Sequence, residues 1–462
     1  MNVLGSAGLV GNPSKCAALT MVRDPKSKKC FVTKGVAITV NGDKIPNLGP
    51  TEHYKYLGIE CGFNRSEGEV ADLLSAYLKR ITDAPLRPQQ KMTILREFVF
   101  ARLQHRLVLG KVKQQTLRDL DIRVRQSVRK WLHLPRDVAK AYIHADIRDG
   151  GLGIPALVLL VPILKQERLL RCQESKDDVV VQATKTKSWQ LSAKSLVKPL
   201  EIAHCVVTDK ESLRDGWRES LLSTVDGRGL TEFRNSPNMS AWVRRGGGMS
   251  GRQFVDAVRM RGNVLWTRER ASRYVGSTVD PNCRRGCGRV ESVDHILQVC
   301  GTVQGARRWR HNNVVTAVVK QLRTDGWTVM EEPNITVGDS YLKPDIVCWK
   351  EGSAATVLDA QIVSDFPGTP LCGRHEEKVE KYDCDDIRRW LSNEAGVTTD
   401  SIRFGSITYN WRGAMSIQSL TQLRAGLNLR VPLLARISRG ILLDSAWIYR
   451  TWLWDHFDAP EG

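Results

Sequence analysis

The stretch "KPDIVCWKEGSAATVLDAQIVSD" (residues 343–365) places two runs rich in β-branched residues on either side of the turn residues "KEGSA". This pattern predicts an antiparallel hairpin centred near Gly352. Symmetric pairing about that centre sets Asp345 opposite Asp359, and directly opposed residues lie about 5 Å apart at Cα. Two carboxylates there repel each other unless a cation neutralises them. Oxygen ligands in a compact site favour Mg2+, which can hold a phosphodiester and activate a water molecule.

A helix is expected directly after the hairpin, over "RHEEKVEKYDCDDIRRWL" (374–391). Its residues Lys378, Lys381 and Tyr382 share one face at i, i+3 and i+4. A lysine that reaches the metal site could orient the water or stabilise charge on the phosphate. The alternative is a solvated helix surface, on which Glu377 and Lys381 form an i, i+4 pair. Paired carboxylates on a hairpin also describe many solvated surfaces, so the residues alone leave both interpretations open.

A second cluster of candidate ligands lies in "CRRGCGRVESVDHILQVC" (283–300). The ligands would be Cys283, Cys287, His295 and Cys300. Three thiolates and one imidazole close a tetrahedral shell around Zn2+ with no open position, so such a site is structural. Gly286 and Gly288 would let the backbone fold tightly around the ion. The alternative is a core histidine with buried cysteines.

The composition narrows the class of protein. A chain of 462 residues is too long for one compact core, so about two to four domains are expected. Its 69 Lys and Arg against 50 Asp and Glu give a net charge of +19, which favours nucleic acid as partner over a metabolic role. The 11 cysteines do not form a secreted disulfide framework, and no segment is typical of a signal peptide or membrane span. We therefore expect a soluble intracellular protein with no membrane partner.

Positive charge is concentrated in two segments. The sequence has helical periodicity from about Leu73 to Arg136. Residues 79–136 hold fifteen Lys and Arg against four acids, which predicts a helical bundle that faces nucleic acid. Residues 244–273 join a Gly-rich loop to a helix, with eight arginines and two acids. That stretch suits phosphate contacts, and Trp266 could stack on a base. The alternative is a buried tryptophan beside a merely solvated face.

The motifs together resemble a known family. The cysteine–histidine cluster, then "ARRWRHN" (306–312), then "KPD" (343–345) with an aspartate fourteen residues after its own, resembles the C-terminal half of a particular polyprotein. That polyprotein belongs to site-specific non-LTR retrotransposons that insert into ribosomal RNA genes. "TYNWRG" (408–413) also matches the end of the family's nuclease region, although no role for it can be derived from the residues.

Earlier segments agree with this resemblance. "AGLVGNPSKCAALTM" (7–21) resembles the segment after the polymerase aspartates, and "EHYKYLGIECG" (52–62) resembles the next palm motif. "RKWLHLP" (129–135) and "DGGLGIP" (149–155) resemble the thumb and its exit. The resemblance implies a multidomain α+β protein. Its parts would be a palm remnant (1–68), a helical thumb (69–155), a helical and basic linker (156–275), a zinc-knuckle region (276–331) and a restriction-endonuclease-like α/β domain (332–462).

The resemblance also implies roles for individual residues. Asp345 and Asp359 would be the Mg2+ ligands and Lys378 the matching lysine, with Lys381 close behind. The usual lysine two positions past the second acid is replaced by Gln361, so the lysine must come from the following helix. With the basic stretch, the expected nucleic-acid-binding residues are Arg244, Arg245, Arg252, Arg307, Arg308, Arg310 and His311.

One family motif is missing. The polymerase needs a Tyr/Phe-x-Asp-Asp turn, and the Asp-Asp pairs at 177–178 and 385–386 have the wrong context. We therefore expect a fragment that begins after the polymerase site and nicks DNA for target-primed reverse transcription in the nucleus. Expected partners are target DNA, element RNA and RNA/DNA hybrid, with a dimer on DNA left open. The alternative is a non-catalytic nucleic-acid-binding protein from a decayed or host-recruited element.

Overall fold

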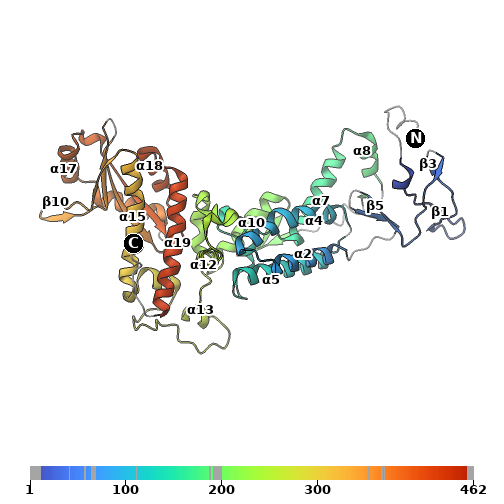
Figure 1. The fold of residues 1–462 in the computed structure, drawn as a ribbon, viewed down its shortest axis with the longest axis horizontal. Coiled ribbons are helices and arrows are strands. Elements are labelled where there is room, and N and C mark those ends of the chain that lie inside the picture. Colours follow the sequence, from blue (N-terminus) through green and yellow to red (C-terminus); the bar gives the residue numbers. More distant parts are fainter. Residues whose placement is uncertain are drawn as a thin grey trace. The chain divides into compact units, whose positions relative to one another are not determined.

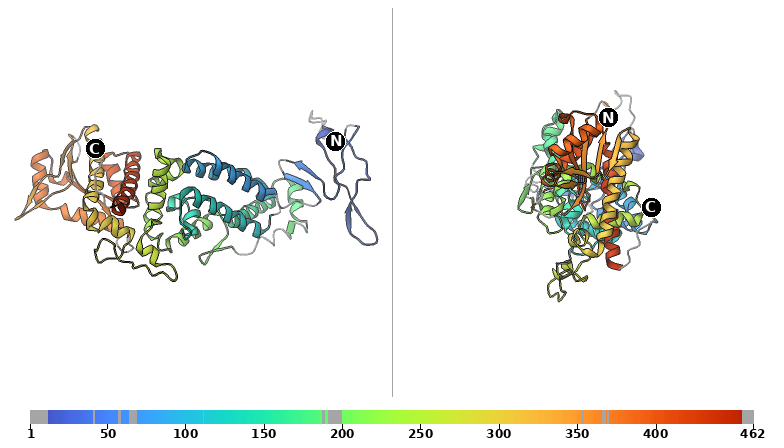
Figure 2. Two further views of the ribbon diagram at one scale, coloured as in Figure 1. Left: turned by 60° about the horizontal axis from the view of Figure 1, so that its bottom comes forward. Right: turned by 90° about the vertical axis from the view of Figure 1, so that its left-hand side faces the viewer.

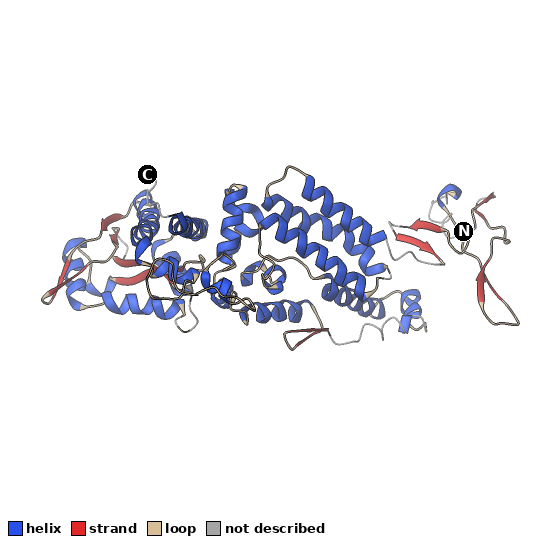
Figure 3. Cartoon of the chain, turned by 90° about the horizontal axis from the view of Figure 1, so that it is seen from below, coloured by secondary structure: helices blue, strands red, loops and turns tan. Residues whose placement is uncertain are grey.

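The computed structural model describes residues 12–40, 42–56, 59–63, 69–110, 112–186, 189–190, 200–351, 354–365, 368 and 370–454. Contacts divide the chain into two compact units. The first comprises Met1–Asp83, Glu97–Val124 and Ala156–Lys198, and the second Ala84–Arg96, Arg125–Pro155 and Pro199–Gly462. The predicted mixed α+β composition is confirmed, with helices predominating (Figures 1 and 3).

In the first unit, short antiparallel strand pairs precede a group of helices. The pairs are β1 (Met21–Arg23) with β2 (Cys30–Val32), β3 (Thr39–Val40) with β4 (Asp43–Lys44), and β5 (His53–Tyr56) with β6 (Ile59–Gly62). The helices are α2 (Glu69–Asp83), α4 (Phe100–Leu109), α7 (Leu157–Gln173) and α8 (Asp178–Thr184), and the short η1 (Pro13–Lys15) comes before the strands. The π-helical η2 (Ile94–Val99) and α5 (Gln114–Leu132) each have residues in both units. The helical structure expected from about Leu73 to Arg136 is therefore confirmed, whereas the palm and thumb assignments stay predictions.

A buried acid holds two of these helices together. Asp121 on α5 accepts hydrogen bonds from the backbone N–H groups of Leu157 (2.8 Å) and Val158 (3.0 Å), at the start of α7. A carboxylate at a helix N-terminus satisfies unpaired N–H groups and complements the helix dipole. One of the few acids in the basic helical block is therefore structural.

The middle of the second unit is built from short helices around buried arginines. Its elements are α3 (Pro88–Thr93), α6 (Lys140–His144), η3 (Ile147–Asp149), β7 (Leu200–Ile202), β8 (Cys205–Val207), α10 (Lys210–Leu222), η4 (Arg228–Arg234), η5 (Pro237–Ser240), α11 (Trp242–Arg245), η6 (Gly246–Gly248), α12 (Gly251–Arg261) and α13 (Arg268–Ser272). Arg261 is fully buried and donates to the carbonyl oxygens of Gly150 (3.0 Å) and Ile147 (3.2 Å). Arg270 is also buried and pairs with Asp137 and Asp226. Two of the eight arginines expected at a phosphate-facing surface therefore hold the fold instead.

The C-terminal part of the second unit is a four-stranded mixed sheet. Its order is β14 (Arg403–Asn410), β13 (Thr356–Val363), β12 (Ile346–Trp349) and β9 (Thr328–Glu331), and a separate pair joins β10 (Ile335–Val337) to β11 (Ser340–Leu342). β12 is antiparallel to both β9 and β13, whereas β13 and β14 are parallel. The parallel step is possible because a long helical connection separates β13 from β14.

Helices pack on both faces of this sheet (Figure 2). The helices of this part of the chain are α14 (Val293–Gln298), η7 (Gly301–Val303), α15 (Gln304–Thr324), α16 (Leu371–Tyr382), α17 (Asp385–Ala395), η8 (Thr399–Ser401), α18 (Ile417–Leu427) and α19 (Val431–Trp454). α16 and α18 contact β14, whereas α15 contacts β9, β12 and β13 and lies beside α19. Val347, Val357 and Phe404 form the core with residues of α17 such as Ile387. The two helical layers bring side chains from α15 and α16 to the hairpin that carries the candidate acids. No helix among the described residues is long and apolar enough to cross a membrane.

Candidate functional site

The hairpin that carries the two acids has the predicted register. Ile346 pairs with Leu358 and Val347 with Val357, so the pairing is centred on residue 352. The turn position Gly352 lies outside the described residues. Asp345 immediately precedes β12, and the same register sets it across from Asp359 on β13.

Asp359 is held by two residues of α16. Its carboxylate is buried, with the residue only 4% exposed. Lys378 Nζ lies 2.5 Å from Oδ2, and the hydroxyl of Tyr382 donates to Oδ1 at 2.7 Å. Burial, followed by the hydrogen bond to Asp359, raises the pKa of Tyr382 well above its ordinary value. The phenol therefore remains a donor to the carboxylate at physiological pH.

Asp345 is held from the opposite side by α15. Its Oδ2 accepts from the backbone N–H of Ala360 at 2.7 Å and lies 3.2 Å from His311 Nε2. The hydrogen bond to Asp345 raises the pKa of His311 to about 9 and outweighs burial, which acts the other way. His311, predicted as a nucleic-acid contact, is thus a cationic partner of the first acid.

The candidate lysines occupy different positions. Lys378 contacts Asp359 directly, whereas Lys381 Nζ contacts the Tyr382 hydroxyl at 3.2 Å and lies 4.7 Å from the centre of its ring. Gln361 Nε2 donates to the carbonyl oxygen of Arg374 at 2.6 Å and to Thr408 Oγ1 at 2.9 Å. Since this amide group is anchored to α16 and β14, α16 supplies the nearest ammonium group to the acids.

The site formed by Asp345, Asp359, His311, Lys378 and Tyr382 is called the acidic site below. Two carboxylates fit Mg2+, which proteins commonly hold through one or two carboxylates while it keeps several waters. The two acids are also neutralised by the imidazolium and the ammonium group beside them. Their mutual repulsion, the basis of the metal expectation, therefore does not by itself require a metal.

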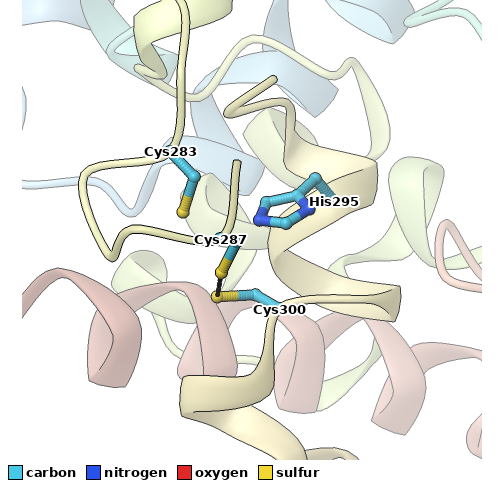
Figure 4. A group of neighbouring side chains, drawn as sticks. All are labelled: Cys283, Cys287, His295 and Cys300. Atoms are coloured by element: carbon cyan, nitrogen blue, oxygen red, sulfur yellow. Dashed lines mark hydrogen bonds between the residues drawn. The ribbon is translucent and has the colours of Figure 1, made fainter. Parts of the chain in front are cut away.

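The cysteine–histidine cluster converges on one point (Figure 4). One ligand atom from each of Cys283, Cys287, His295 and Cys300 lies within 4.8 Å of all the others. The Sγ atoms of Cys287 and Cys300 are 3.5 Å apart, close to the roughly 3.8 Å expected between thiolates that bind one Zn2+ tetrahedrally. Both ring nitrogens of His295 are buried and have no hydrogen-bond partner in the part of the chain that the structure describes.

The backbone around the cluster explains how the four residues meet. Gly286 and Gly288 have φ values of 74° and 66°, a region that side chains disfavour, so the chain turns sharply on both sides of Cys287. Ser292 caps α14 by accepting from the N–H of His295 at 2.9 Å. The predicted knuckle geometry is therefore present, and the orphan imidazole in a thiol cluster fits a zinc ligand.

The seven predicted nucleic-acid-binding residues do not form one surface. Arg244, Arg245, Arg252 and Arg308 are exposed. Arg307 is half-buried and donates to the carbonyl oxygen of Cys300 at 2.7 Å. Arg310 is only 1% exposed and donates to Ser445 Oγ at 2.8 Å and to the carbonyl oxygen of Leu297 at 3.0 Å. Burial lowers the pKa of Arg310 to about 10. The expectation for Arg310 is corrected, because its guanidinium joins α14, α15 and α19 inside the protein.

The "TYNWRG" segment, which had no role in the sequence, connects the knuckle to the sheet. Trp411 Nε1 lies 3.0 Å from both Asp294 Oδ1, next to the ligand His295, and Asp365 Oδ1, beyond β13. Arg412 pairs with Asp365 and donates to the carbonyl oxygen of Arg261 at 3.1 Å. The segment is therefore a joint between three parts of the second unit.

Comparisons with known proteins identify the family. No family model matches the chain. The chain is 33% identical over 430 residues to the retrovirus-related Pol polyprotein from type-2 retrotransposable element R2DM of Drosophila melanogaster, covering 92% of this chain and 40% of that protein. It is 31% identical over 423 residues to the retrovirus-related Pol polyprotein from type-1 retrotransposable element R2 of Nasonia vitripennis, covering 91% and 40%. A Popillia japonica protein of the latter name is 33% identical over 377 residues, covering 81% of this chain and 77% of that protein. The chain thus spans 40% of the length of the first two relatives. It belongs to the family of retrovirus-related Pol polyproteins of R2 retrotransposable elements.

Proposed function

We propose that this chain is the C-terminal part of an R2-type polyprotein and that the acidic site is a Mg2+-dependent endonuclease that nicks target DNA. The observation that carries the proposal is the register of Asp345 with Asp359, together with the 2.5 Å contact between Lys378 and the second acid. The acids come from the hairpin and the ammonium group from α16, so three chemically suited groups meet from two separate elements.

Each residue of the acidic site then has a role. Asp345 and Asp359 hold the cation, which when bound supplies a Lewis acid for the phosphate and an acidic water. Tyr382 fixes the orientation of Asp359 through Oδ1, and His311 with the Ala360 N–H fixes Asp345 through Oδ2. Lys378 stabilises negative charge on the phosphate, because its ammonium group is half-buried and stays next to the carboxylate. Lys381 supports this group through Tyr382.

The zinc knuckle has a structural role in this proposal. Zn2+ bound by Cys283, Cys287, His295 and Cys300 leaves no open position for chemistry. Asp294, next to one ligand, is joined to the sheet by Trp411. We infer that the knuckle fixes the position of α14 relative to the sheet that carries the acidic site.

The whole polyprotein would use this nick to prime reverse transcription. Its polymerase would copy element RNA from the new 3′ end, in the nucleus, with RNA/DNA hybrid as an intermediate partner. The names of the relatives, retrovirus-related Pol polyproteins, support this assignment at the level of the family. The palm, thumb, linker and restriction-like divisions belong to the same proposal, as does cooperation of two copies on DNA.

A second candidate function is a non-catalytic clamp on nucleic acid. It is favoured by the ion pairs that neutralise both acids without a metal. Such a protein would retain the exposed arginines and the knuckle but would not cut DNA.

A plasmid-nicking assay distinguishes the two functions. The purified chain in Mg2+ is compared with Asp345→Ala and with the matched control Asp339→Ala, an exposed acid six positions away. We expect Asp345→Ala to nick at least about 100-fold more slowly, with DNA affinity retained, and Asp339→Ala to match the parent. Equal nicking by all three proteins would refute the assignment of the nuclease to the acidic site. Salt-sensitive DNA binding with no nicking by any of them would favour the clamp.

A further inference from the structure

An open groove in the second unit lies away from the acidic site. It has a volume of about 760 Å3 and is bordered by α12, the C-terminal end of α19 and the segment before α13. Its lining includes Arg252, Arg259, Trp266, Tyr449, Arg450 and Trp454. No residue of the acidic site or of the knuckle's ligand set lines it.

Two exposed tryptophans of the described part of the chain line this groove. Trp266 is 50% exposed and Trp454 is 72% exposed, whereas every other described tryptophan is buried or half-buried. Large aromatic rings are costly to leave in water, and isolated exposure of one ring is common. Because both exposed indoles line the same groove, the groove is suited to bind flat, apolar faces.

One of the two rings is already fixed in place. The Arg284 guanidinium lies 4.8 Å from the centre of the Trp266 ring and 4.7 Å from that of the buried Trp452. The hydroxyl of Tyr449 donates to the carbonyl oxygen of Trp266 at 2.5 Å. A guanidinium therefore packs on the Trp266 ring while half of the residue remains exposed to solvent. Because the ring is already ordered, binding of a stacking partner costs less conformational entropy.

The remaining lining is basic. Arg252 is exposed, and neither it nor Arg259 has an acidic partner among the described residues. Arg450 pairs with Asp256, the acid of the lining. The net positive charge repels the same face of another copy and attracts a polyanion.

We propose that this groove binds single-stranded nucleic acid, with bases stacked on Trp454 and Trp266 and phosphates paired with Arg252 and Arg259. Alternating aromatic and guanidinium groups are the features that single-strand sites combine. A duplex keeps its base faces stacked internally, so it cannot use the indoles. Trp266 and Arg252 were predicted as nucleic-acid contacts from the sequence. The groove adds Trp454, at the C-terminal end of α19.

The test measures binding of fluorescein-labelled twelve-nucleotide strands to the full chain by anisotropy. Trp454→Ala is compared with Tyr341→Ala, a control aromatic on β11 that is 70% exposed and lies outside the groove. We expect Trp454→Ala to bind oligo(dT) about 5- to 150-fold more weakly than the parent, because base stacking is lost. A strand of abasic sites, which has no bases to stack, should bind to Trp454→Ala and to the parent with equal affinity. Arg252→Ala should instead flatten the salt dependence of the affinity by about 0.7 in log–log slope, with Arg424→Ala on α18 as the control.

Comparing the affinities for oligo(dT) and oligo(rU) shows whether the groove prefers DNA or RNA, and either preference supports the proposed binding site. The proposal is overturned if Trp454→Ala binds single strands as Tyr341→Ala does, or if duplex affinity falls equally. It is also overturned if the variant changes only sedimentation, which would make the groove an interface between copies. Nicking of duplex plasmid by Trp454→Ala should match the parent, so failure of the nuclease and failure of the groove are separable.

Discussion

Removing one hydroxyl tests how the acidic site is held together. Tyr382→Phe deletes the donor to Asp359 and keeps the ring that packs in the core beside Ile387. The phenol has one proton and two acceptors within reach, Asp359 Oδ1 at 2.7 Å and the carbonyl oxygen of Lys343 at 3.2 Å. The phenol donates this proton to the Asp359 carboxylate and not to the carbonyl oxygen, because the carboxylate is closer and charged.

The size of the effect follows from burial. A hydrogen bond to a charged group contributes about 1.5–3 kcal/mol, and Asp359 is too buried for water to replace the lost donor. We therefore expect local opening of β13 and α16 to become about 10- to 150-fold more frequent in Tyr382→Phe. Hydrogen exchange measured by mass spectrometry on peptides of β13 reports this opening directly.

A matched control and a double variant make the measurement decisive. Tyr341→Phe removes the same atom from an exposed tyrosine on β11 and should leave exchange unchanged. In an Asp359→Asn background, Tyr382→Phe should cost less, because the charged acceptor is gone. Equal exchange in Tyr382→Phe and Tyr341→Phe would refute the hydrogen-bonded arrangement of the acidic site.

Two further predictions concern the knuckle and pH. Chelation of zinc should speed both the alkylation of Cys283 and hydrogen exchange in residues 283–300, and atomic absorption should show the loss of one Zn2+ per chain. The control Cys30→Ser, which removes an exposed thiol, should bind zinc normally. A Cys283→Ser variant with full zinc content would contradict the ligand set. Because the pKa of His311 is raised from 6.5 to about 9, its contact with Asp345 stabilises the fold fully below about pH 6.5 and is lost as pH rises through about 9. Allowing for solvent screening of this half-buried pair, about 1–2 kcal/mol of local stability should disappear over that window. Exchange in 343–349, corrected for intrinsic rates, should show this loss in the parent and in His204→Gln but not in His311→Gln; the same pH dependence in His311→Gln would exclude this cause.

Local patterns made much of the acidic site predictable. The strand period of two and a short turn fix the partner of each hairpin residue, so Asp345 and Asp359 could be paired from their spacing alone. The helical period places Lys378 and Tyr382 on one face of α16, and both contact Asp359. The same holds for the knuckle, whose ligands lie within 18 residues.

Contacts between distant elements were not predictable. His311 reaches Asp345 across 34 residues of sequence, and nothing in the spacing indicates which helix will lie against the hairpin. The groove brings together Trp266, which lies just before α13, and Trp454, which ends α19. The joint formed by Trp411 likewise depends on tertiary packing of α14 against the sheet.

The run "ARRWRHN" shows why a basic motif is not automatically a basic surface. In an α-helix each residue is turned about 100° from the last, so consecutive side chains point to different sides. Arg308 is exposed, Arg310 is buried, and His311 contacts Asp345, although they are almost adjacent. A phosphate-binding stripe on a helix therefore needs basic residues at i, i+3 and i+4 rather than in a row.

The same reasoning changes what the net charge of +19 means. Among the described residues four arginines are buried, namely Arg261, Arg270, Arg310 and Arg412, and each donates to at least one backbone carbonyl oxygen. A guanidinium suits this use because its five N–H donors can bind several carbonyls at once, which a lysine cannot do in one plane. These charges lie inside the second unit and cannot pair with phosphates. The surface that meets nucleic acid is therefore defined by where cations lie next to exposed aromatic rings, as in the groove, and not by the total charge of the chain.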